Sequence, residues 1–180
     1  MRTLFIVFAS VLVTCLGYGQ KFTTNSGTIK FISKAQLELI QASSNKLQGI
    51  LDPATHQFAF LIDMKSFQGF NTGLQRQHFN ENYIESEKFP LAKFSGKVIE
   101  QVDYTQNGVS EVRAKGELDI HGQKQVRIIK SKITVNGNQI FIEAQFLIPL
   151  SDHNITIPKI VNQKIATEIE VGVSATLLRE

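Results

Sequence analysis

The chain has 180 residues, which is enough for one domain or two very small ones. With 42% apolar and 19% charged residues its composition is globular, which excludes disordered, collagen-like and coiled-coil proteins. The formal net charge is only +3 and no cluster of Lys and Arg concentrates it, so we expect no nucleic-acid partner.

The first nineteen residues have the pattern of a secretory signal. One Arg precedes an apolar run of about a dozen residues, and Gly17 and Gly19 stand at positions −3 and −1 of a cut before Gln20. A helix that spans a membrane needs roughly 20 apolar residues, so this run is too short for a stable membrane span. We predict a signal peptide over residues 1–19 and an exported domain over residues 20–180.

Cys15 allows a second interpretation of this segment, because Leu12–Cys15 resembles a lipobox. Thr14 stands where that motif needs Gly, Ala or Ser, so a lipid-anchored form is the minor alternative. Cleavage before Gln20 removes the only Cys, and the exported domain must then be held together by its core without a disulfide.

Apolar and polar residues alternate with period two through most of the remaining chain, which predicts β-strands. The pattern is clearest over residues 111–120, where one face is apolar and the other is charged. Similar runs lie at 29–31, 37–39, 58–64, 92–98, 140–148 and 165–177. A further run over 125–135 changes parity near Ile128-Ile129, which indicates a bulge or bend. Together these runs predict about eight strands.

Residue pairs that favour turns separate the runs, and their spacing fits an antiparallel up-and-down arrangement. The pairs are Asn45-Lys46, Asp52-Pro53, Asn107-Gly108, His121-Gly122 and Asn136-Gly137. Alternation stops over residues 72–87, where Thr72 and Gln75 form a possible capping box and a helical spacing begins. The prediction is an all-β fold: an antiparallel eight-stranded barrel with one or two short helices between its early and middle strands.

The inward faces of the predicted strands mix small and large residues. Ala92, Gly96, Ala114, Gly116, Ala144 and Ala175 share these faces with Phe58, Phe60, Phe94 and Phe146. The mixture fits a packed core whose residue sizes follow a taper, and it fits equally an apolar cavity with Phe walls. The chain has 13 Phe, 3 Tyr and no Trp, which suits a hydrocarbon ligand that needs no hydrogen bonds.

Two blocks of sequence resemble the YceI-like proteins. The block 74–94 contains the pair His78-Phe79, then Phe89-Pro90 and the strand residue Phe94. The block 116–124 contains Gly-x-Leu-x-x-His-Gly, which is similar to a hairpin of that family. The order and spacing of the blocks and the secretory signal also fit the family.

This resemblance implies a lipocalin-like barrel, periplasmic or secreted, that binds long apolar molecules such as polyisoprenoids or isoprenoid quinones in its interior. It implies no catalytic residues and no cofactor, and it leaves a homodimer possible. Many members carry an Arg-Asp pair just before the His-apolar pair, whereas this chain has Gln75-Arg76. A head-group contact through that carboxylate is therefore not carried over.

We predict that the ligand is held by inward-facing residues and by a gate at the barrel mouth. The predicted lining is Phe31, Phe58, Phe60, Phe94, Ala114, Gly116, Leu118, Phe146 and Val173, and the predicted gate is Phe67, Phe70, Leu74 and Phe79. His78 either contacts a head group or is hydrogen-bonded to a loop carbonyl. His121 has the parity of the charged face and precedes a Gly, so we interpret it as a turn residue.

Other candidate sites are weak. Ser151-Asp152-His153 cannot form a hydrolase triad, because adjacent residues do not reach one another in the required geometry and no nucleophile elbow is present. The four His lack metal-ligand spacing, so we expect no metal site. Asn154-Ile155-Thr156 is a glycosylation sequon that matters only in a eukaryotic secretory route. The alternative to a lipid carrier is a solid barrel that acts as a structural or interaction protein of the cell envelope.

Overall fold

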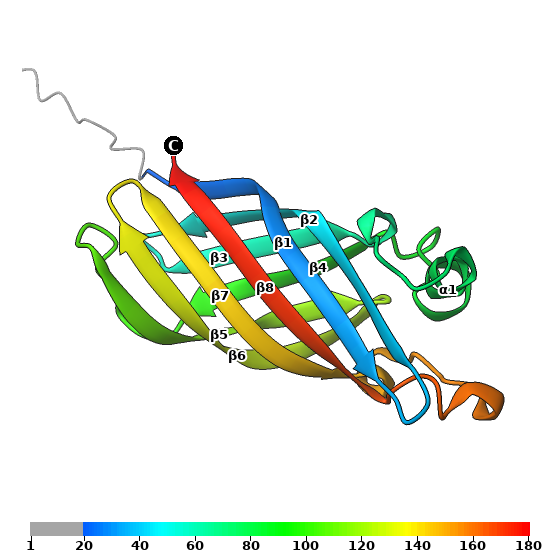
Figure 1. Ribbon diagram of the computed structural model, residues 1–180. Helices are drawn as coiled ribbons and strands as arrows, with labels where there is room; N and C mark the ends of the chain where they lie inside the picture. The colour runs from blue at the N-terminus through cyan, green and yellow to red at the C-terminus, as the bar shows by residue number, and fades with distance from the viewer. Residues whose placement is uncertain (1–19) are drawn as a thin grey trace, which may run out of the picture.

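The computed structural model describes residues 20–180 as a closed barrel of eight antiparallel strands (Figure 1). Each strand pairs with the next in the chain, and β8 closes the barrel by pairing with β1. The strands are β1 (Phe22–Lys34), β2 (Leu39–Asp52), β3 (Gln57–Asp63), β4 (Leu91–Val98), β5 (Gly108–Ile120), β6 (Gln123–Asn136), β7 (Gln139–Pro149) and β8 (Glu168–Arg179). The predicted barrel is confirmed. The predicted signal peptide and Cys15 lie outside the described residues.

The short helical elements all lie at one end of the barrel, which we call the open end (Figure 1). They are the 3₁₀ turns η1 (Met64–Ser66), η3 (Leu150–His153) and η4 (Lys159–Val161), the helix α1 (Gly73–His78) and the π-helical turn η2 (Phe79–Tyr83). Among residues 20–180, no helix is long and apolar enough to cross a membrane.

Helix α1 begins as the sequence predicts. Thr72 has extended backbone, and its Oγ1 accepts a hydrogen bond from the backbone N–H of Gln75 at 3.1 Å. The Gln75 side chain accepts in return from the backbone N–H of Asn71 at 3.1 Å, one residue before the expected partner. The cap fixes where the chain turns back over the open end.

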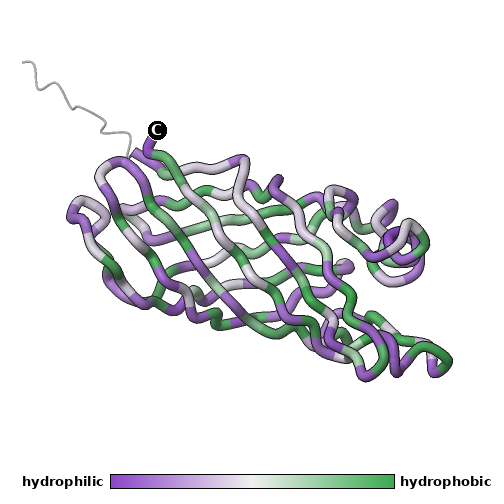
Figure 2. Tube along the Cα trace, in the orientation of Figure 1, coloured by the Kyte–Doolittle hydropathy of each residue, from purple (hydrophilic) through white to green (hydrophobic). Residues whose placement is uncertain are grey.

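Strand β5 shows how alternation makes the wall of the barrel. Val112, Ala114 and Leu118 are buried, whereas Glu111 and Arg113 are exposed. Because successive side chains of a strand point to opposite faces, one sequence pattern supplies both the dry interior and the charged exterior. Figure 2 shows this alternation of apolar and polar residues around the barrel.

Two local predictions are wrong. The bulge expected at Ile128-Ile129 is absent, because the pairing of β6 with β5 is continuous from Gly108↔Val135 to Ile120↔Gln123. The pairing of β6 with β7 runs only from Ser131↔Ala144 to Asn136↔Gln139, so that ladder ends close to Ile128-Ile129. The apparent change of parity arises because Ile128 faces outward and is 56% exposed. Asn45-Lys46 is not a turn but lies inside β2, where the pairing with β1 shifts between Gly27↔Leu47 and Ile29↔Ser44. This bulge moves the buried parity from Ser44 to Leu47.

The other turn predictions hold to different degrees. His121 and Gly122 form a two-residue hairpin loop with φ of +54° and +69°. Asp52 begins the β2–β3 turn, where its Oδ1 accepts from the N–H of Ala54 at 2.9 Å. The β6–β7 turn has Gly137 and Asn138 at its centre, one residue later than predicted. Asn107 ends a long loop between β4 and β5 instead of a tight hairpin.

Side chains fill the end of the barrel opposite to α1, which we call the closed end. Phe22, Ile140 and Leu177 have no exposed surface there, and Tyr104 is 3% exposed. The guanidinium of Arg179 lies 5.0 Å from the ring centre of Phe22, and its Nη2 donates to the Tyr104 carbonyl at 3.1 Å. Burial raises the pKa of Tyr104 to about 12. This plug seals the closed end.

We expect Leu177→Ala to lower the free energy of unfolding by about 2–5 kcal/mol, because it opens a void in the plug. The neighbouring Leu178 is 53% exposed, and Leu178→Ala should change the free energy by less than about 0.5 kcal/mol. Urea unfolding followed by far-UV circular dichroism measures both. Equal effects of the two changes would show that the closed end is not packed as described.

Candidate ligand-binding cavity

A cavity of about 520 Å³ runs from the plug to the open end of the barrel. Its deep walls are aliphatic and aromatic, with Leu51, Phe58 and Val112 among them. Because the plug closes one end, a molecule can enter this space only from the side of α1 and η4. The packed-core interpretation of the small and large residues therefore does not describe this barrel.

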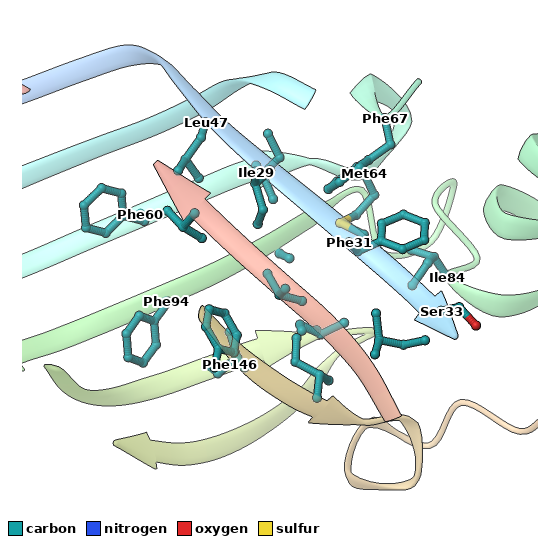
Figure 3. Close-up of a pocket in the computed structure, with 18 of the residues that line it drawn as sticks. Ile29, Phe31, Ser33, Leu47, Phe60, Met64, Phe67, Ile84, Phe94 and Phe146 are labelled. Atoms are coloured by element: carbon teal, nitrogen blue, oxygen red, sulfur yellow. The ribbon is translucent and has the colours of Figure 1, made fainter. Parts of the chain in front are cut away.

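Aromatic rings line the deeper part of the cavity. The ring centres of Phe58 and Phe94 are 5.0 Å apart, and those of Phe58 and Phe60 are 6.1 Å apart. Figure 3 shows Phe60, Phe94 and Phe146 on one side of the cavity, with Phe31 and its neighbours on the other. These rings present no hydrogen-bonding group, so the site favours hydrocarbon over polar ligands.

Four Phe rings meet at the mouth: Phe67, Phe70 and Phe79 belong to the predicted gate, and Phe31 belongs to the predicted lining. The Phe31 ring is stacked on Phe79 at 5.3 Å and lies 5.5 Å from Phe67 and 5.8 Å from Phe70. Phe70 and Phe79 are 5.2 Å apart. Because Phe79 belongs to η2 and Phe31 to the barrel wall, this cluster, which we call the Phe gate, joins the insertion to the barrel.

The polar residues of the cavity are concentrated near its mouth. Glu38, Gln75, His78 and Lys164 line the cavity there, and the Gln75 amide donates a hydrogen bond to Glu38. His78 is exposed and forms no hydrogen bond to any other described residue, so the expected bond to a loop carbonyl is absent. A ligand with one polar end would place that end here and its apolar part inside.

Thirteen of the fourteen predicted site residues line the cavity, and their contact with a ligand stays a prediction. They are Phe31, Phe58, Phe60, Phe67, Phe70, Leu74, His78, Phe79, Phe94, Ala114, Leu118, Phe146 and Val173. Gly116 does not line it. It faces Gly96 across the β4–β5 ladder, and the Phe94 ring covers it. A side chain at Gly116 would overlap the Ser95 carbonyl before it reached the cavity.

Sequence reasoning missed residues on β2 and β6. Leu47 and Leu51 line the cavity but follow the bulge that the sequence analysis took for a turn. Ile129 and Ile133 also line it, and an unbroken odd parity along β6 would have identified them.

His121 has the structural role that its parity suggested. Its Nε2 lies 2.7 Å from a Glu85 carboxylate oxygen, its Nδ1 lies 3.0 Å from the His153 carbonyl oxygen, and its ring packs edge-on against Phe89 at 4.6 Å. It therefore ties the β5–β6 hairpin to the two loops of the open end, and it does not line the cavity.

The Ser151-Asp152-His153 segment is structural too. His153 is fully buried, and its Nδ1 lies 3.1 Å from the Gln123 carbonyl oxygen, while Asp152 lies 3.6 Å from Arg127. The carbonyl oxygen makes Nδ1 the protonated nitrogen, so Nε2 is left as a buried acceptor without a partner in the described chain. Among residues 20–180, no group of three or more His, Cys, Asp or Glu is placed to hold a metal ion.

We expect Gly116→Ala to destabilise the protein by about 1–3 kcal/mol, because even a methyl group would lie 3.0 Å from Phe94 and push into the β4 backbone. Gly172, also in a strand, has open space where its Cβ would lie, so Gly172→Ala should be within about 0.5 kcal/mol of wild type. Urea unfolding of the two variants tests the close approach, and a neutral Gly116→Ala would disprove it.

Burial lowers the pKa of His153 below its ordinary value of 6.5, because a proton on Nε2 would have no partner. The neutral form is thus favoured in the folded state, and the contribution of His153 to the free energy of unfolding is complete above pH 6.5. As the pH falls below 6.5 the unfolded chain takes up a proton that the folded chain resists, so the free energy of unfolding decreases.

We therefore expect His153→Gln to reduce the loss in free energy of unfolding that the wild type shows between about pH 7 and pH 5. Urea midpoints at the two pH values measure this. An unchanged difference between them in the variant would contradict the assignment, and His78→Gln, at an exposed histidine, serves as control.

The chain matches a family model described as YceI-like domain over residues 17–177. No curated protein matches it. Similar solved structures include a polyisoprenoid-binding domain from Saccharophagus degradans implicated in plant cell wall breakdown, with a TM-score of 0.75 and 15% identity over 89% of this chain and 98% of that one. BcnA of Burkholderia cenocepacia has a TM-score of 0.68 and 16% identity, and the match covers 84% of this chain and 95% of that one. The YceI protein of Campylobacter jejuni has a TM-score of 0.59 and 15% identity, and the match covers 76% of this chain and 82% of that one. The chain belongs to the YceI-like family.

Proposed function

We propose that this protein binds a long apolar molecule of the isoprenoid or isoprenoid-quinone type inside its barrel, after export to the periplasm or beyond. The observation that carries the proposal is the apolar cavity of about 520 Å³, which has one sealed end and polar residues near the other. Such a space accepts a hydrocarbon chain lengthwise, with any polar end group left at the mouth.

The energy of binding would come from the removal of apolar surface from water. Each Å² buried contributes about 25 cal/mol, against the loss of ligand and side-chain freedom. The walls need no reorganisation of hydrogen bonds, because the deep lining is made of side chains such as Phe58, Ile133 and Ile142. A stiff polar molecule would gain little in this site, since it would lose its hydration without new partners.

Similarity to known proteins supports the same ligand class. The Saccharophagus degradans domain, which shares the fold, is a polyisoprenoid-binding domain. The family and the secretory pattern of residues 1–19 together support an envelope or extracellular location.

A binding role also fits the chemistry of the cavity better than catalysis does. Its titratable lining residues are Glu38, His78, Tyr83, Lys93 and Lys164. They come from the segments at the open end, so none is placed against the body of a molecule held inside. The solid-barrel alternative requires a filled interior, and the cavity argues against it.

The test is a matched pair of substitutions on β7. Ala144 lines the cavity, and its neighbour Gln145 is exposed on the outer face. We expect Ala144→Phe to reduce ligand retention at least about tenfold by filling the space, whereas Gln145→Phe should bind like wild type.

Retention is measured by incubating each protein with detergent-solubilised ubiquinones of graded chain length, removing detergent and free quinone by gel filtration, and quantifying bound quinone by absorbance. Circular dichroism confirms that both variants are folded. Equal retention by the two variants, or none by the wild type, would contradict binding in this cavity.

A further inference from the structure

Large apolar side chains stand in solvent around the mouth of the cavity. Ile160 on η4 is 91% exposed, Leu74 on α1 is 59% exposed, and Leu37 and Leu39 at the β1–β2 hairpin are 64% and 53% exposed. Burying such residues is favourable, so their exposure at one end of the molecule calls for a partner. We call these four residues the apolar rim.

The apolar rim comes from three segments that are far apart in the sequence and lie at the same end of the barrel. Figure 1 shows α1, the β1–β2 hairpin and the segment before β8 projecting beyond the strands at the open end. Figure 2 shows apolar stretches on these projections, interleaved with hydrophilic ones. Hydrogen bonds join the three segments: the Asn71 side chain donates to the Leu39 carbonyl at 2.8 Å, and the Leu37 N–H donates to the Gln163 carbonyl at 2.8 Å. The apolar rim is therefore held together as one surface at the mouth.

The most exposed tip carries positive charge beside its apolar residue. Lys159 precedes Ile160 and Lys164 follows it, and residues 155–167 contain no Asp or Glu. Neither lysine forms an ion pair with another described residue. An apolar tip flanked by free ammonium groups matches a phospholipid surface, where the lysines meet phosphate and the apolar side chain meets the acyl chains.

The apolar rim is continuous with the cavity. Leu74 belongs to the rim and also lines the cavity. Val161, which follows Ile160 in the chain, and Lys164 line the cavity as well. A lipid that leaves a bilayer would therefore pass from the rim, between the polar side chains of the mouth, to the Phe gate and the apolar interior.

We propose that the open end docks on an anionic phospholipid membrane, with the side chains of Ile160, Leu74, Leu37 and Leu39 inserted and Lys159 and Lys164 on the head groups. This inference rests on the proposed function, because it describes how the ligand would be taken up and released. In this orientation the mouth of the barrel faces the membrane, and the barrel axis points into the lipid.

Flotation with vesicles tests the docking. Vesicles of phosphatidylcholine with phosphatidylglycerol are mixed with the full exported domain, and the bound fraction is measured after a density gradient. We expect Leu37→Asp/Ile160→Asp to lower binding at least about tenfold, since each change places a carboxylate at the inserted surface. Val109, which is 62% exposed on β5 near the closed end, gives the matched control: Val109→Asp should bind like wild type.

A second arm separates this inference from the proposed function. Leu37 and Ile160 do not line the cavity, so quinone retention from detergent should be unchanged in the double variant. Quinone retention without vesicle binding by the wild type would overturn the docking and leave the proposed function standing. Equal vesicle binding by the double variant and wild type would also overturn it. Vesicle binding without quinone retention would instead overturn the proposed function.

Discussion

Closure of the sheet by the β1–β8 pairing is the constraint on which the rest of the structure depends. A closed barrel gives every strand one inner and one outer face, and its strand number sets an interior that side chains can fill or that can hold one small ligand. Here the inner faces do not fill it. Small residues such as Ala114 and Ala144 line the interior together with the Phe rings, and their small side chains leave a cavity.

The two ends of the barrel then differ because different segments close them. Phe22, Tyr104 and Leu177 pack into a plug at one end, beside the start of β1 and the C-terminus. At the other end the chain leaves the sheet between β3 and β4 and between β7 and β8, and these two excursions, together with β1 and the β1–β2 hairpin, carry the Phe gate, the polar mouth and the apolar rim. The closed end is thus filled by side chains, whereas the cavity opens at the other end.

Much of this arrangement can be predicted from the sequence, because it depends on local patterns. Alternation along β5 gives the strand and its inner face, and the pairing of Thr72 with Gln75 gives the start of α1. The failures have identifiable causes. Asn45 is of a type that occurs both in turns and in β-bulges. Only the pairing of β2 with β1 shows that a bulge is present here. Val126 and Ile128 are apolar but exposed on the outer face of β6, so the sequence pattern suggests a change of parity that the strand does not have.

Other features depend on contacts between distant segments, which no local pattern reveals. Gly116 has the inward parity of its neighbours, yet the approach of Gly96 and the Phe94 ring keep it from the cavity. The contacts of His121 with Glu85 and with the His153 carbonyl join three segments. The parity of His121 predicted only that its side chain points away from the interior.

The central claim is that the cavity holds an isoprenoid-type lipid in the cell. The most direct measurement is mass spectrometry of an organic extract of the protein, expressed with its own first nineteen residues and purified from a bacterial periplasm without added ligand. We expect about one isoprenoid or isoprenoid-quinone molecule for each folded protein. An extract without lipid from folded protein, repeated after isoprenoid is supplied, would contradict it.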